Sequence, residues 1–168
     1  MSKDESLRTV RSDSGFSLIE VIVVVAVILI IGAIAVPRLM QARAAANEAS
    51  AASSLRVISQ MQIHYQTSFG LGFAPSLDAL GPPISGQQPS ATAAGLIDSV
   101  LASGIKNGYS FVYVPIDTGN GIPLKYTMNA NPISPGQTGD RYFYLDETNV
   151  IRWKRDGPAD RTSPPLPN

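Results

Sequence analysis

The sequence has no cysteine and only one histidine among its 168 residues. Without cysteine there is no disulfide, no thiolate nucleophile and no cysteine-ligated zinc or iron–sulfur site. Charged residues make up 15% of the chain, against about 25% in an average soluble domain. The 13 basic and 13 acidic residues cancel, so no basic face for direct nucleic-acid binding is predicted.

Recognisable catalytic motifs are also missing. The sequence contains no P-loop and no GxGxxG, GxSxG or HExxH pattern. The one histidine, His64, lies beside Tyr65 in a predicted helix, where a solvated or packed side chain is the simplest interpretation. Catalysis needs a positioned acid, base or nucleophile with a tuned pKa. We therefore predict that the protein is not an enzyme, and a membrane-anchored enzyme is the disfavoured alternative.

The most distinctive feature present is an apolar block at residues 16–40, in which Glu20 is the only charged residue before Arg38. As a helix, the stretch from Phe16 to Pro37 is about 33 Å long, enough to cross a bilayer core of about 30 Å. Its many β-branched residues would also suit a strand. A single segment in a membrane must satisfy its own backbone hydrogen bonds, however, and only a helix does so. A single-pass membrane helix is therefore predicted.

This helix is predicted to continue beyond the apolar block. Residues 41–66 hold no glycine or proline and are rich in alanine, the best helix former. Their apolar side chains recur on one face, at Leu55, Ile58, Met61 and Tyr65. The helix should end near Ser68, because Gly70 follows. A helix of this length exceeds the diameter of such a small domain, so its apolar half is expected to protrude. A kink or local unwinding is expected over Gly32–Pro37, since proline removes one helical hydrogen bond.

The rest of the chain predicts a small α+β head. A single helical turn at residues 75–80, capped by Ser76, and a helix at residues 93–102 lie within a loop-rich region. Four short runs with β-type alternation follow, at residues 109–115, 124–128, 142–145 and 150–153. We expect an antiparallel sheet of about four strands, with the second half of the long helix packed on it. The proline-rich tail should be extended and could pack on the sheet edge.

The residues around the start of the apolar block carry a resemblance to a known family. Ser14-Gly15-Phe16-Ser17-Leu18-Ile19-Glu20, followed by the apolar run and Pro37, resembles the N-terminal signal of type IV pilins and type II secretion pseudopilins. The resemblance implies cleavage after Gly15 by a prepilin peptidase and N-methylation of the new terminal residue, Phe16. A secretory signal peptide is the competing interpretation, but its apolar region would be shorter and would precede the cleavage site.

This resemblance divides the chain into three parts. Residues 1–15 would be a leader, residues 16–40 the membrane-spanning and filament-core half of the helix, and residues 41–168 the globular head. The resemblance also implies that Glu20 neutralises the Phe16 amine, often that of a neighbouring subunit, and so governs assembly together with Pro37. The alternative is that Glu20 stays hydrated at the headgroup boundary.

By resemblance, the protein is a structural subunit of a type IV pilus-like filament that serves adhesion, motility or DNA uptake. It would start in the inner membrane, with the leader in the cytoplasm and the head outside, and end in an extracellular pilus. An assembly ATPase and a platform membrane protein are the implied partners. The alternative is a pseudopilin in a periplasmic pseudopilus for protein export, which the missing cysteine pair favours, because many pilins close their C-terminal region with a disulfide.

Calcium is the one cofactor that the sequence brings into question. Major pseudopilins bind calcium through an acidic loop, and oxygen ligands at irregular spacing suit this ion. Asp117, Asp140 and Asp146 lie in predicted loops or strand ends and are the candidate ligands. The alternative is that these acids are solvated turn residues, in which case no cofactor is expected.

Overall fold

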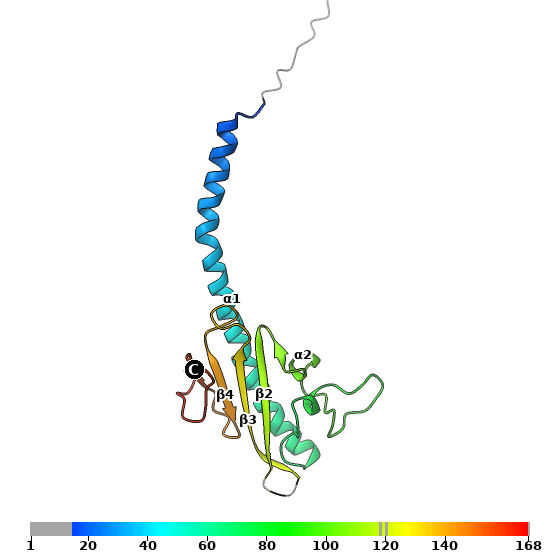
Figure 1. Cartoon of the computed structure of the whole chain (residues 1–168). Helices are drawn as coiled ribbons and strands as arrows, with labels where there is room; N and C mark the ends of the chain where they lie inside the picture. The colour runs from blue at the N-terminus through cyan, green and yellow to red at the C-terminus, as the bar shows by residue number, and fades with distance from the viewer. Residues whose placement is uncertain (1–14, 118, 120, 168) are drawn as a thin grey trace, which may run out of the picture. The chain divides into compact units, whose positions relative to one another are not determined.

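The computed structural model describes residues 15–117, 119 and 121–167. The chain divides into two compact units, one ending at Arg38 and the other running from Leu39 to Asn168. Helix α1, Leu18–Phe69, has 52 residues and contributes to both units (Figure 1). It ends at Phe69, one residue beyond the predicted position, and is followed by Gly70, whose φ of 66° is the left-handed conformation that glycine adopts readily.

Helix α1 runs without interruption through Gly32 and Pro37. The local unwinding expected there is therefore wrong. A proline inside a helix lacks only its own backbone donor, so the neighbouring turns can keep their hydrogen bonds and the helical conformation. The kink that was predicted as the other possibility stays a prediction.

The sheet has five antiparallel strands in the consecutive order β1-β2-β3-β4-β5. They are β1 Ile105–Lys106, β2 Tyr109–Asp117, β3 Pro123–Pro132, β4 Tyr142–Asp146 and β5 Arg152–Lys154. The four predicted strands are present, and the predicted number is one too low. The missed strand, β1, is two residues long and pairs only with Tyr109 and Ser110 of β2, so it has no alternation that the sequence could show.

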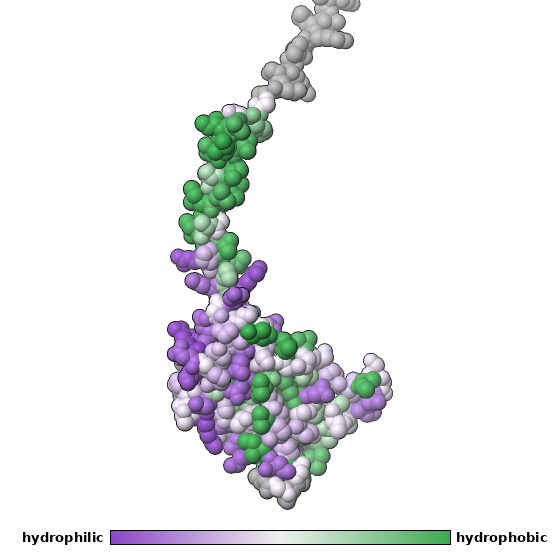
Figure 2. Space-filling view, viewed as in Figure 1, coloured by the Kyte–Doolittle hydropathy of each residue, from purple (hydrophilic) through white to green (hydrophobic). Residues whose placement is uncertain are grey.

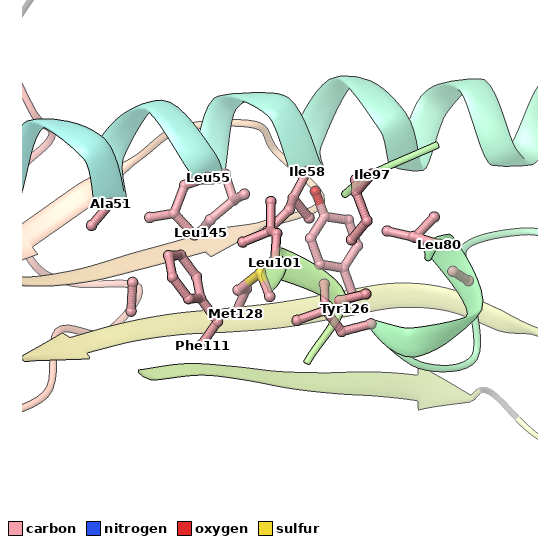
Figure 3. Packing of buried hydrophobic residues seen from close by; sticks show 14 of the residues in the cluster. Ala51, Leu55, Ile58, Leu80, Ile97, Leu101, Phe111, Tyr126, Met128 and Leu145 are labelled. Atoms are coloured by element: carbon pink, nitrogen blue, oxygen red, sulfur yellow. The ribbon is translucent and has the colours of Figure 1, made fainter. Parts of the chain in front are cut away.

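The core lies between α1 and one face of the sheet. Ile58 and Leu55 of α1 are fully buried, and Figure 3 shows them pointing toward Leu145, Met128 and Phe111 of the strands. The predicted apolar face of the helix is thus confirmed. Along β2 the inward side chains alternate with exposed valines, as a sheet with one covered face requires.

The segment between α1 and β1 is mostly irregular, with the 3-10 helix η1, Asp78–Leu80, and the short helix α2, Ser99–Ala102. The predicted cap of the first turn is present, since Ser76 Oγ accepts a hydrogen bond from Ala79 N at 3.1 Å.

The helix predicted over residues 93–102 forms only in its second half. In its first half, Ala94 N donates to Ala79 O at 2.8 Å, and Leu96 N and Ile97 N donate to Leu80 O at 2.9 and 3.0 Å. These long-range bonds occupy the donors that a local helix would use, so tertiary contacts override the local helical pattern.

The C-terminal tail packs on the β5 edge of the sheet. Trp153 N donates to Pro164 O at 3.0 Å, and Leu166 N donates to Ile151 O at 2.8 Å. Asn129 Nδ2 donates to Ala159 O at 2.8 Å, so the tail also contacts β3. The expected packing of the tail on the sheet edge is confirmed.

Candidate assembly surface

The first part of α1 presents an exposed apolar surface. It is the one helix among the described residues that is long and apolar enough to cross a membrane, by length and composition. None of its most apolar 18-residue window is buried against the rest of the chain. Figure 2 shows this stretch coloured as hydrophobic on the side in view. An apolar surface of this extent needs a lipid or protein environment.

The amino end of α1 is organised by Ser17 and Glu20. Ser17 O accepts the first helical hydrogen bond, from Val21 N at 3.3 Å, so Ser17 is the N-cap residue and Glu20 is the third helical residue. A carboxylate in the first turn interacts favourably with the helix dipole. Ser17 was not singled out from the sequence, although its S-x-x-E spacing before an apolar run is the signal of a capping box.

Phe16 and Glu20 lie on the same shallow hollow in the surface of α1. Val21, Val24 and Val25 complete its lining, so the Glu20 carboxylate lies on an almost wholly apolar surface. The Glu20 side chain makes no ion pair within the described residues, and Phe16 is 82% exposed. The Glu20 carboxylate can therefore pair with a cation from another molecule. The apolar side chains around it can be buried in the same contact.

Gly15, Phe16 and Ser17 precede the first turn of α1 and have no regular secondary structure. A Cβ added at Gly15 would meet no atom within 4 Å, and Gly15, Phe16 and Ser17 are all exposed. An enzyme that cleaves an extended chain could therefore reach the bond after Gly15. Residues 1–14 of the expected leader lie outside the described residues.

Pro37 is exposed on α1, at the end of the charge-free stretch, and is separated from Glu20 by more than four helical turns. The two residues therefore do not form one site. Each is a separate feature of the apolar surface.

The calcium candidates Asp117, Asp140 and Asp146 can be placed in the structure. No group of three or more His, Asp or Glu side chains that could hold a metal ion occurs among the residues that the structure describes. Asp117 at the end of β2 accepts hydrogen bonds from Gly119 N and Gly121 N, both at 2.8 Å. Asp140 is exposed in the loop before β4. The three acids thus do not form one metal-binding group among the described residues, and calcium binding stays a prediction.

Asp146, the third calcium candidate, is buried at the end of β4 with 1% exposure. Its carboxylate accepts hydrogen bonds from Thr148 N at 3.0 Å and from Thr148 Oγ1, and it pairs with Arg161 Nε at 3.4 Å. A buried carboxylate needs such partners, because desolvation of an unpaired charge is costly. The role that these contacts give Asp146 is to anchor the tail.

Residues 10–36 match a family model described as the prokaryotic N-terminal methylation motif. The match includes Gly15, Phe16 and Glu20 and ends one residue before Pro37. The chain thus carries a prepilin-type signal, and its long helix packed on an antiparallel sheet is a pilin-like α+β fold. No curated protein and no solved structure matches this chain.

Proposed function

We propose that this protein is a structural subunit of a type IV pilus-like filament, assembled through the first part of α1. The observation that carries the proposal is the coincidence of the methylation motif with an exposed apolar helix surface. Full burial of one valine- or leucine-sized side chain is worth about 1.5–3 kcal/mol, so covering this surface is a strong driving force. Head-to-tail packing that does not close into a ring generates a filament.

In this proposal, processing precedes assembly. The leader, residues 1–15, is removed after Gly15 by a prepilin peptidase, and the new terminal residue Phe16 is N-methylated. The apolar stretch holds the subunit in the inner membrane with the head outside. An assembly ATPase and a platform membrane protein then move the subunit from the membrane into the filament, where residues 16–40 form the core and the head, residues 41–168, lies outside.

Glu20 has a defined role in this proposal. A carboxylate within a membrane-depth helix costs up to about 2.5–3.5 kcal/mol, and less near the helix end. The terminal amine of Phe16 on a neighbouring subunit offsets this cost when the two subunits dock, which fixes their axial register. Pro37 removes one backbone hydrogen bond near the end of the filament-core segment, which allows the helix to bend there.

The proposal is tested by the mass of the purified N-terminal peptide. A peptide that begins at Phe16 and carries one added methyl group supports the proposal. An N-terminus at Met1, or one beyond the apolar stretch, contradicts it.

A mutational test follows from Glu20. Glu20→Gln should leave processing unchanged, because the cleavage site is intact, and should lower filament yield at least about tenfold, since one buried charge pair is lost. Yield is measured by shearing and sedimentation. Lys125→Gln, which also removes one charge but lies on β3, is the matched control. Wild-type yield from Glu20→Gln would overturn the pairing.

A pseudopilin of type II secretion is the second candidate. The chain has no cysteine, and its tail is held instead by the Arg161–Asp146 ion pair and by backbone hydrogen bonds to Ile151 and Trp153. This favours a short periplasmic filament over a disulfide-closed surface pilus. Electron microscopy of cells separates the two, because surface filaments support the pilus and their absence at normal expression supports the pseudopilus.

A further inference from the structure

A hollow of about 210 Å³ lies in the head unit beside the beginning of its helical part. Helix α1 supplies one wall, loop 133–141 the second, and Arg155, just after β5, the third. The lining residues are Met40, Gln41, Ala44, Ala45, Glu48, Gly136, Asp140, Arg141 and Arg155. Phe16, Glu20 and Pro37 do not line it.

Three hydrogen bonds tie the loop wall of this hollow to α1. Asn47 Nδ2 donates to Thr138 O at 3.0 Å. Glu48 Oε1 accepts hydrogen bonds from Asp140 N at 2.7 Å and from Arg141 N at 3.2 Å. The loop is therefore held against the helix by side chains of two successive helical residues, and the hollow is a built feature of the head.

Arg141 is fixed at the floor of the hollow. Its Nε lies 3.5 Å from Glu48 Oε2, and its guanidinium carbon lies 4.6 Å from the ring centre of Trp153. Stacking on an aromatic ring and one ion pair hold the planar fork in place. Its two terminal nitrogens make no hydrogen bond within the described residues and remain available to an anion.

Arg155 supplies the second cation. It is exposed and makes no ion pair within the described part of the chain. Glu48 is already engaged by Arg141 and by two backbone donors, so Asp140 is the only acid of the hollow without a side-chain partner in these contacts. Two arginines at one hollow match a phosphate group, which accepts several hydrogen bonds at once.

The position of the hollow along the chain indicates the source of the phosphate. Met40 and Ala44 follow Pro37, the last residue of the charge-free stretch, by about 4.5 and 10.5 Å of helix. The headgroup layer on each side of a bilayer core is about 5–7 Å thick. If the apolar stretch spans the membrane, as the proposed function requires, Met40 at one end of the hollow lies within the headgroup layer, and Ala44 lies just beyond it. Arg38 and Arg43 add positive charge along the same segment of the sequence.

We propose that this hollow binds the phosphate of an anionic phospholipid, with Arg141 and Arg155 as its donors, and so docks the head on the membrane before assembly. The inference rests on the proposed function, since it needs the apolar stretch in the bilayer. It goes beyond that function by assigning the head its own lipid site. Trp153, the only tryptophan of the chain, lies under Arg141 and reports on the site directly.

The experiment uses the full chain in phosphatidylcholine vesicles that hold a constant small amount of lipid with a nitroxide on the headgroup. Phosphatidylglycerol then replaces phosphatidylcholine stepwise, and quenching of Trp153 fluorescence is recorded. Quenching should increase and saturate as phosphatidylglycerol rises. Arg155→Ala should raise the half-saturating fraction about two- to fivefold, as expected for one exposed charge pair.

Two further variants make the test specific. Asp140→Asn removes the competing anion with little change of shape, and it should lower the half-saturating fraction by a similar factor. Lys125→Ala removes a charge from β3, which does not line the hollow, and should leave the titration unchanged. Equal responses of the wild type and the Arg155→Ala and Asp140→Asn variants would overturn the site.

Flotation of the vesicles separates failure of the site from failure of the proposed function. If the chain floats with the vesicles and Trp153 quenching does not respond to phosphatidylglycerol, the lipid site is wrong and the membrane anchor stands. If the chain does not float with vesicles of either composition, the membrane stage of the proposed function is wrong, and the site is overturned with it.

Discussion

Helix α1 contains two regions that are equally helical for different reasons. Its first region, residues 18–38, has almost no polar side chain and buries almost nothing within the chain, so its helicity depends on backbone hydrogen bonding in an apolar environment. Its second region, residues 39–69, is amphipathic and is fixed by packing on the sheet. The comparison teaches that one uninterrupted helix can serve two environments, because the pattern of side chains changes while the backbone does not.

The largest expected effect comes from the same substitution made in both regions. Leu55 is fully buried and Leu29 is 67% exposed. Leu55→Ala should destabilise the head by about 2–5 kcal/mol, through lost burial and the cavity left behind. Leu29→Ala should leave head stability unchanged. Urea unfolding of the head in detergent, followed by tyrosine fluorescence, measures both, and equal losses would mean that the two regions are not independent.

The second largest effect is expected at high pH, which should unfold the head and leave the first region of α1 helical. Burial raises the pKa of Tyr109 and Tyr113 above the ordinary value of 10.0, and each hydroxyl donates to a backbone carbonyl, Arg141 O and Ala74 O respectively. A raised pKa means that folding disfavours the ionised form. The stability is therefore complete below pH 10 and is lost as the pH rises above it.

The measurement for this prediction is circular dichroism in detergent above pH 10, with tyrosine ionisation followed by its absorbance. The head should unfold, while residues 21–37, which contain no ionisable group, should keep their helical signal. Tyr113→Phe should move the transition to higher pH. Simultaneous loss of all helical signal would contradict the separation of the two regions.

The smallest effect is expected at the surface of the head. Asp98 caps α2, accepting from Leu101 N at 2.9 Å, and pairs with Lys106 Nζ at 2.9 Å. The hydrogen bond from Lys106, and then that from Leu101, lower the pKa of this carboxyl below 3.8. Its contribution is thus present above that pH and is lost as the pH falls through the lowered value.

Asp98→Ala should cost about 1 kcal/mol at neutral pH, a typical value for a lost N-cap. Thermal melting at pH 7 and at pH 2.5 checks this, because wild type and variant should differ at the first pH and differ less at the second. Asp156→Ala, which removes an exposed acid outside any helix cap, is the control. A constant difference at both pH values would contradict the assignment to the ionised carboxylate.

The elements that could be predicted are those whose signal lies within one short stretch of sequence. The apolar block, the helical face of Leu55 and Ile58, and the alternation of β2 are patterns of this kind. The elements that were missed depend on distant partners. The donors of Ala94 and Leu96 are taken by carbonyls of residues 79 and 80, and β1 exists only because β2 pairs with it.

For the candidate assembly surface, sequence and structure contribute differently. Gly15, Phe16 and Glu20 were recognisable because their spacing is a motif, and the match over residues 10–36 covers them. The calcium hypothesis had no such support, because acidic residues in separate turns carry no information about which turns meet. The pairing of Asp146 with Arg161 could not be read from the sequence for the same reason.

The hydrogen bonds of the C-terminal tail to Ile151 and Trp153 affect how heads can contact one another at high concentration. A sheet edge with free backbone donors and acceptors is a template on which another chain can add a strand. In a filament the heads would stand at very high local concentration, where such additions are most probable. Pro164 occupies the donor of Trp153 in β5, and Leu166 occupies the carbonyl of Ile151 just before it, so the tail blocks strand addition at these positions. The tail therefore protects the β5 edge of each head against pairing with the sheet of a neighbouring head.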